Sequence, residues 1–221
     1  MSPQASVVVL FDVDNTLLDN DAVQNDLSAY LEREFGAAVR DRYWSIFEAL
    51  RNEVGYADYL GALQRYRLEA PDDPRVLLVS SFLLDYPFAS RLYPGALAAV
   101  AHMQEFGPAV VLSDGDAVLQ PRKIMRSGLW DAVQGRVLIY VHKEQMLDTV
   151  ARLYPAGRYV MVDDKVRILA AVKQHWGSRV TCIFPRQGHY ARDAGSTAAY
   201  PAPDVSIDAI AELASYDVGT S

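Results

Sequence analysis

Short, almost unbroken apolar segments recur along this chain, each shorter than an ordinary helix. They lack the polar–apolar alternation of a strand with one face in water, so they are typical of strands buried on both faces of a parallel sheet. The four clearest segments and a fifth candidate are Val7–Phe11, Ala109–Leu112, Tyr159–Val162, Val180–Phe184 and Val137–Val141. A sheet buried on both faces needs a covering layer on each side, and helices usually supply it.

Helical patterns fill most of the intervals between these segments. They cover Ala96–Glu105, Leu119–Arg126, Glu144–Leu153 and Val166–His175. Glycine, which often ends a helix, follows the first two and the last of these patterns. Strand alternating with helix at this spacing predicts an α/β fold with a doubly wound parallel sheet.

The interval Asp21–Tyr86 contains helical periodicities and no segment that resembles a buried strand. Its apolar and aromatic residues fall into four stripes, which we interpret as packing surfaces of helices. We therefore predict an all-helical cap at residues 21–87, inserted into a core of residues 1–20 and 88–221. The later segment Gly188–Pro203 reads as a polar loop, and Val205–Leu213 is expected to close the core.

Composition excludes several classes of partner. The formal net charge of -7 argues against nucleic acid and anionic membranes, since both attract basic surfaces. No apolar stretch is long enough to span a bilayer, and Met1–Leu10 lacks the features of a signal peptide. Cys182 is the only cysteine, so an internal disulfide is impossible. We expect a reduced, cytoplasmic protein, either a monomer or a homodimer.

Polar residues gather where the predicted strands end. Asp12 and Asp14 follow the first strand, and side chains two residues apart on an extended chain project to the same side. Other strand ends carry Ser113-Asp114-Gly115, Lys143 and Asp163-Asp164. Ligands of open α/β sheets bind beyond the carboxyl ends of the strands, so these groups should meet there.

The chemistry of this set points to phosphate and a metal ion. Clustered carboxylates repel one another and require a cation or a proton between them. A ligand set made only of oxygen favours magnesium. A hydroxyl, an ammonium and backbone N–H groups are suitable donors to phosphate oxygens. Together they predict phosphoryl transfer, in which positioning and charge neutralisation supply most of the catalysis.

In these motifs the chain resembles the haloacid dehalogenase superfamily. The first family motif, a strand followed by Asp-x-Asp-x-Thr, corresponds to Asp12–Thr16. The second, a strand ending in Ser or Thr, corresponds to Ser113, and the third, a lysine, to Lys143. The fourth, an acidic motif after a strand, corresponds to Asp163-Asp164. The motifs occur in the family's order, and the resemblance implies a magnesium-dependent phosphatase that acts on a small phosphorylated substrate.

The resemblance also implies a role for each residue. Asp12 would attack phosphorus to form an aspartyl-phosphate, and Asp14 would be the general acid and base. Asp12, the backbone carbonyl of Asp14 and Asp163 would coordinate Mg²⁺, with Asp164 binding directly or through water. The phosphate-binding groups would be Ser113, the backbone amides of Asp114 and Gly115, and Lys143.

Two positions depart from the family pattern. Lys143 is followed by Glu144, where many relatives have proline. It could instead be a solvated residue at a helix start, and Lys123 would then be its substitute, although Lys123 resembles a surface position in the family. Asn15 stands where glycine is commoner, but asparagine tolerates positive φ. The four histidines lack metal-ligand spacing and are expected at the surface or in packing.

Three other functions were compared with the phosphatase. A dehalogenase of the same superfamily lacks the second acid of the first motif, which Asp14 supplies here. A phosphomutase also has the second acid of the first motif, so this alternative remains. A phospho-accepting signalling or binding protein either orders its acids and acceptor differently or has lost a catalytic acid, and Asp12, Asp14 and Asp163 are all present.

Overall fold

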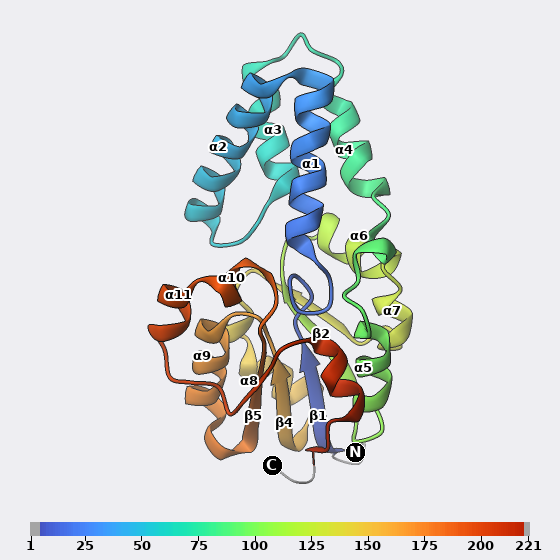
Figure 1. Cartoon of the computed structure of the whole chain (residues 1–221), viewed down its shortest axis with the longest axis vertical. Coiled ribbons are helices and arrows are strands. Elements are labelled where there is room, and N and C mark those ends of the chain that lie inside the picture. Colours follow the sequence, from blue (N-terminus) through green and yellow to red (C-terminus); the bar gives the residue numbers. More distant parts are fainter. Residues whose placement is uncertain (1–4, 219–221) are drawn as a thin grey trace.

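The computed structural model describes residues 5–218 and contains a single parallel sheet (Figure 1). Residues 1–4 and 219–221 of the predicted core lie outside the described residues. The strands are β1 (Ala5–Phe11), β2 (Ala109–Asp114), β3 (Val137–Tyr140), β4 (Ala156–Val162), β5 (Val180–Pro185) and β6 (Val205–Ile207). They lie in the order β3-β2-β1-β4-β5-β6, and all five pairings are parallel. This sheet confirms the predicted α/β fold.

The absence of alternation in the strands follows from burial on both faces. On β1, Val7, Val9 and Phe11 belong to one apolar cluster, whereas Val8 and Leu10 belong to a second cluster on the other face. Each of these five side chains is at most 4% exposed. Every position along the strand therefore needs an apolar side chain, whichever face it points to.

Helices cover both faces. One face packs against α5 (Ala96–Met103), α6 (Leu119–Arg126), α7 (Leu129–Ala132) and the 3₁₀ segment η4 (Ile210–Ser215). The other packs against α8 (Leu147–Leu153) and α9 (Val166–Trp176). Shorter elements are η1 (Phe88–Arg91), η2 (Lys143–Gln145), η3 (Gly177–Arg179), α10 (Gly188–Arg192) and α11 (Ala194–Ala198). The segment predicted as a polar loop at 188–203 thus contains two short helices.

Four helices stand over the carboxyl edge of the sheet (Figure 1). They are α1 (Asn20–Phe35), α2 (Ala37–Val54), α3 (Tyr59–Glu69) and α4 (Val76–Asp85), and we call them the helical insert. Their aromatic side chains pack inside it, as Phe47 and Tyr59 show with ring centroids 4.8 Å apart. One apolar cluster includes residues of β1 and of all four helices. The insert therefore rests directly on the part of the chain that carries the first motif.

Within residues 5–218, no helix combines the length and the apolar composition needed to cross a membrane.

Because β1 is buried, we predict that a cavity made in this strand lowers the stability of the whole protein. Leu10 is fully buried, so Leu10→Ala should lower the free energy of unfolding by about 2 to 5 kcal/mol. Urea denaturation followed by circular dichroism measures this change. Leu68→Ala is the matched control, because Leu68 is 82% exposed and its truncation should cost less than about 0.5 kcal/mol. Equal losses in the two variants would contradict the assigned core.

Candidate active site

Strand register brings the first, second and fourth motifs side by side. β1 lies between β2 and β4, with Phe11 paired to Val111 on one side and to Val162 on the other. The next residue after Phe11 is Asp12, and the next after Val162 is Asp163. The Asp12 backbone N–H donates to the Val162 carbonyl over 3.0 Å, which holds these two strand ends together. The predicted meeting of the motifs therefore follows from parallel pairing.

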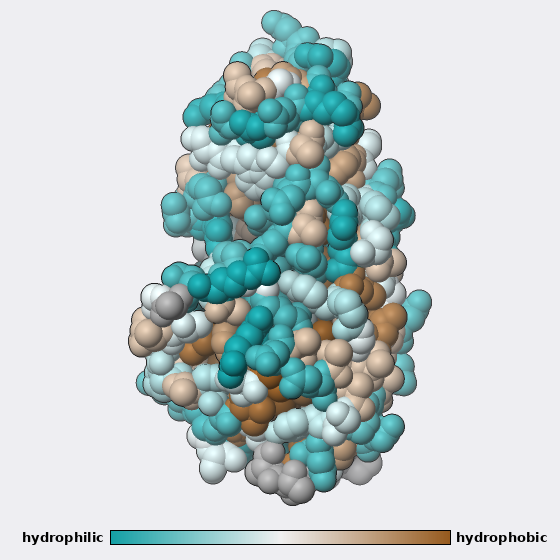
Figure 2. All heavy atoms as spheres, in the orientation of Figure 1, coloured by the Kyte–Doolittle hydropathy of each residue, from teal (hydrophilic) through white to brown (hydrophobic). Residues whose placement is uncertain are grey.

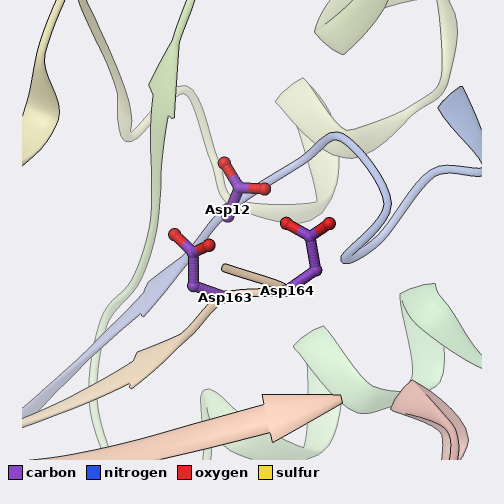
Figure 3. Close-up of side chains that lie close together, drawn as sticks. All are labelled: Asp12, Asp163 and Asp164. Carbon is purple, nitrogen blue, oxygen red and sulfur yellow. The ribbon is translucent and has the colours of Figure 1, made fainter. Parts of the chain in front are cut away.

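Three buried carboxylates face a common space beyond these strands (Figure 3). One carboxylate oxygen from each of Asp12, Asp163 and Asp164 lies within 4.8 Å of the others. Among the described residues, neither oxygen of Asp164 has a hydrogen-bond donor, although both are buried. Unpartnered, buried carboxylate oxygens are costly unless a cation binds them or they take up protons. The donor set thus fits a hard divalent cation.

The titration of these acids reflects the same crowding. Burial, followed by the negative charge of Asp12, raises the pKa of Asp163 to about 6, against a lowering effect of the Lys143 ammonium. Burial also raises the pKa of Asp164 well above its ordinary value, with further contributions from Asp12 and Asp163. Both acids therefore hold their protons more tightly than carboxyls in water do.

Lys143 is buried beside two of these three acids. Its Nζ lies 2.5 Å from Oδ1 of Asp12 and 2.6 Å from Oδ2 of Asp163. Burial alone would lower the pKa of Lys143, but the nearby charges of Asp12 and Asp163 outweigh it and raise that pKa. The alternative of a solvated lysine at a helix start is therefore wrong. A hydrogen bond of 2.7 Å from the Lys143 backbone N–H to Asp114 Oδ1 ties η2 to the end of β2.

Thr16 and Asn15 shape the turn that follows Asp12. Thr16 Oγ1 donates to Asp12 Oδ2 over 3.2 Å and accepts from the Asp164 backbone N–H over 3.0 Å. Asn15 adopts a φ of 62°, as the asparagine at this position allowed. Its Oδ1 accepts from the backbone N–H groups of Asn20 and Asp21, so the same turn begins α1.

The second motif packs against α6. Ser113 is buried, and its Oγ accepts a hydrogen bond of 2.9 Å from Gln120 Nε2. A Cβ at Gly115 would lie 2.6 Å from Cγ of Gln120, so glycine is what permits this close approach. The Ser113 hydroxyl remains the candidate donor to phosphate, with the Asp114 amide beside it. The Gly115 backbone N–H instead donates to the Tyr140 carbonyl over 2.9 Å, so the expected phosphate contact from this amide is wrong.

Asp14 is held apart from the three buried acids. Its Oδ1 lies 2.7 Å from Nζ of Lys123, and its Oδ2 lies 3.4 Å from Nε2 of Gln120. Lys123 is only 1% exposed, so the expected surface position of this lysine is wrong. Sequence reasoning missed both partners. One signal in the sequence was available: Gln120 and Lys123 lie on the same helical stripe as the apolar residues Leu119 and Ile124. All four side chains of this stripe are buried.

A cavity of about 600 Å³ opens beside these residues. Asp14 and Asp164 are among its lining residues. The others include, from the insert and the core, Gln24, Arg51, Tyr56, Lys165, Arg167, His189 and Tyr190. Among the described histidines, His189 alone lines the cavity; its side chain is 48% exposed, and its Nδ1 lies 2.6 Å from Asp21 Oδ1.

Of the insert's arginines, Arg51 alone is among the cavity-lining residues. Arg33, Arg40, Arg42, Arg65 and Arg75 pair with carboxylates on the surface instead. The outer face of the insert is accordingly largely hydrophilic in the view of Figure 2. The tertiary structure thus shows which arginine of the insert faces the cavity, which the sequence alone did not indicate.

Comparison with known proteins identifies the family. The family model of haloacid dehalogenase-like hydrolases matches residues 7–175. A solved structure from Burkholderia xenovorans LB400, described as a haloacid dehalogenase-like hydrolase, is 64% identical, covers 97% of this chain and 100% of its own, and superposes with a TM-score of 0.93. The chain belongs to the haloacid dehalogenase-like hydrolase family.

More distant structures share the fold of this hydrolase. A Bacillus subtilis HAD-hydrolase bound to magnesium is 15% identical, with 95% of this chain and 97% of that chain covered and a TM-score of 0.60. L-2-haloacid dehalogenase from Xanthobacter autotrophicus, with chloropropionic acid covalently bound, is 16% identical, with coverage of 94% and 96% and a TM-score of 0.62. No curated protein matches the chain.

The carboxylate cluster of this hydrolase predicts pH-dependent stabilisation by magnesium. A carboxyl group whose pKa is raised by folding stabilises the folded protein while it is protonated, and this contribution is lost as the pH rises through that pKa. The melting temperature of the metal-free protein should therefore fall between pH 5.5 and pH 8. A divalent cation bound by this cluster would compete with the protons of Asp163 and Asp164, so added Mg²⁺ should raise the melting temperature more at pH 8 than at pH 5.5.

Differential scanning fluorimetry with and without Mg²⁺ measures both effects. Asp163→Asn should remove most of the Mg²⁺-induced shift at pH 8. Asp131→Asn is the control, because Asp131 is exposed on α7, outside the cluster. If the melting temperature does not change on addition of Mg²⁺ at either pH value, the metal assignment is contradicted.

Proposed function

We propose that this hydrolase removes phosphate from a small phosphorylated metabolite through an aspartyl-phosphate on Asp12, with Mg²⁺ as its cofactor. The observation that carries the proposal is the placement of Asp14. Its carboxylate lines the cavity, stays 22% exposed and has its own ammonium partner, separate from the buried acids around Asp12. A carboxyl group so placed can exchange a proton with a ligand in the cavity.

The residues of the site suit a two-step transfer. In the first step an Asp12 oxygen forms a bond to phosphorus, the ester P–O bond breaks, and Asp14 gives its proton to the leaving oxygen. In the second step Asp14 takes a proton from water, the water oxygen bonds to phosphorus, and the Asp12–phosphorus bond breaks to release phosphate. Lys143 and Thr16, which contact different oxygens of Asp12, would keep its carboxylate oriented throughout.

Mg²⁺ would be held by Asp12, Asp163, the backbone carbonyl of Asp14 and, directly or through water, Asp164. When bound, such an ion neutralises negative charge on a phosphoryl group. Ser113, Lys143 and the backbone amide of Asp114 would donate to the phosphate oxygens. This division leaves Asp14 free for proton transfer.

Dehalogenation and phosphomutase chemistry make different demands on the same site. A departing halide needs no proton, so a dehalogenase has no use for a cavity-facing acid such as Asp14. A phosphomutase would return the phosphate to another position of its substrate and release little of it. Net release of inorganic phosphate distinguishes the proposed hydrolysis from both reactions.

Substitution of the two acids tests the mechanism. With Mg²⁺ and p-nitrophenyl phosphate, Asp12→Asn should abolish phosphate release and form no phosphoenzyme, because an amide is a poor nucleophile. Asp14→Asn should slow turnover by about 10²-fold or more, the scale of a lost general acid and base. Mass spectrometry of the quenched enzyme should find phosphate only on Asp12.

The same exposed Asp131→Asn serves as the control and should retain wild-type turnover. Phosphate located on another residue would overturn the assignment of Asp12. Halide released from 2-chloropropionate, with no phosphate released from any ester tested, would favour a dehalogenase instead.

The insert should determine which leaving group is accepted. Arg51 lines the cavity, where its guanidinium donates to the Tyr190 hydroxyl and lies 3.6 Å from the Glu48 carboxylate. Its other N–H groups can donate to a polar or anionic leaving group. In a screen of phosphorylated metabolites, Arg51→Met should lower kcat/KM for the preferred esters by about tenfold, the loss of one charge-assisted contact. Hydrolysis of p-nitrophenyl phosphate should change by less than about twofold. A uniform fall on all substrates would instead indicate a damaged site.

Arg42→Met is the matched control, because Arg42 lies on the same helix but pairs with Glu69 at the surface. Equal losses on every substrate with Arg51→Met, or efficient dephosphorylation of intact phosphoproteins, would contradict selection of small leaving groups.

A further inference from the structure

We infer that Lys123 is a positioning residue that holds Asp14 for proton transfer and links its orientation to the helical insert through Asn20 and Tyr59. The inference rests on the proposed function, because it concerns the acid and base of that reaction. It adds a second buried lysine to the site, with a task distinct from that of Lys143.

Burial of Lys123 is costly and calls for a specific reason. Lysine is among the residues least often fully buried, and removing an ammonium from water is costly unless partners offset the loss of hydration. Lys123 is 1% exposed, on a stripe of α6 that also buries Leu119 and Ile124. An apolar side chain would pack on that stripe without the cost, so packing alone does not account for a lysine there.

The partners of Lys123 account for its burial. Its ammonium donates to Asp14 Oδ1 over 2.7 Å and to Asn20 Oδ1 over 3.0 Å. Gln120, one turn earlier on α6, lies 3.4 Å from the other oxygen of Asp14. Donors on both oxygens restrict rotation of the Asp14 carboxylate, which at 22% exposure would otherwise be free to turn towards solvent.

The same ammonium also contacts the insert. Asn20 is the first residue of α1, and its Nδ2 donates to the hydroxyl of Tyr59 over 3.1 Å. Tyr59 begins α3, is buried, and accepts a second hydrogen bond of 2.9 Å from Gln24 of α1. Lys123 Nζ lies 5.9 Å from the centroid of the Tyr59 ring, within the range of a cation–π contact. A shift of α1 or α3 relative to α6 would therefore change the contacts that orient Asp14.

A double-mutant cycle tests whether Lys123 acts through Asp14. Lys123→Met keeps most of the length of the side chain and removes its charge. With phenyl phosphate, whose leaving oxygen needs a proton, kcat/KM should fall by at least about tenfold, a part of the full effect of general acid catalysis. In an Asp14→Asn background the same substitution should cost less than about twofold, because the group it positions is already absent.

Leaving-group dependence provides a readout that a purely structural role would not change. In a series of substituted phenyl phosphates, Lys123→Met should lower kcat/KM most for the poorest leaving groups and least for p-nitrophenyl phosphate. Tyr59→Phe removes only a hydroxyl from the same network, so it replaces Lys123→Met if that variant does not fold. It should change the dependence of kcat/KM on the leaving group in the same direction. Lys173→Met is the matched control, because Lys173 lies on α9 and pairs with Asp204 outside the cavity.

The outcomes separate the inference from the proposed function. If wild-type enzyme releases no phosphate from any ester, the proposed function fails. If wild type is active but the soluble variants retain its leaving-group slope, the inference fails and the function stands. Equal losses from Lys123→Met in the wild-type and Asp14→Asn backgrounds would also overturn the inference, since they would show that Lys123 does not act through Asp14.

Discussion

Asp12, Asp163 and Asp164 are buried together with carboxylate oxygens within 4.8 Å of one another, and their mutual repulsion must be offset for the chain to fold around them. Lys143 provides part of the compensation, because its ammonium contacts both Asp12 and Asp163. The carboxylate oxygens of Asp164 have no such partner among the described residues, and burial, together with the charges of Asp12 and Asp163, raises the pKa of Asp164. A divalent cation would supply the remainder.

Two buried lysines divide the acids of the site into separate groups. Lys143 belongs with the carboxylates at the strand ends, and Lys123 belongs with Asp14 at the cavity wall. This separation suits a reaction in which one aspartate must stay ionised as a nucleophile while another gains and loses a proton. The two ammonium groups come from different elements, η2 and α6.

The helical insert has two consequences for the site. It supplies Gln24, Arg51 and Tyr56 to the cavity, so a ligand there is enclosed by side chains from the insert as well as the core. It also packs on the sheet through one shared apolar cluster and contacts Lys123 through Asn20 and Tyr59. Ligand enclosure and the orientation of Asp14 therefore depend on the same interface.

Much of the fold and the convergence of the motifs could be predicted from the sequence, because both depend on local patterns and on one topological rule. Strands buried on two faces must be apolar throughout, as β1 is, and the carboxyl ends of parallel strands lie at one edge. Asp12, Ser113 and Asp163 follow such strands directly, so their proximity did not require knowledge of the packing of any helix.

What only the tertiary structure decided lies mainly on helices. A helical side chain turns by about 100° per residue, so whether it is buried depends on which neighbours pack around the helix and at what angle. Lys123 resembled a surface residue until the packing of α6 placed it beside Asp14, and Arg51 could not be distinguished from the other arginines of the insert. The sequence by itself determined which groups the strand ends present; tertiary packing decided which helical side chains reach them, because that depends on contacts between segments distant in the chain.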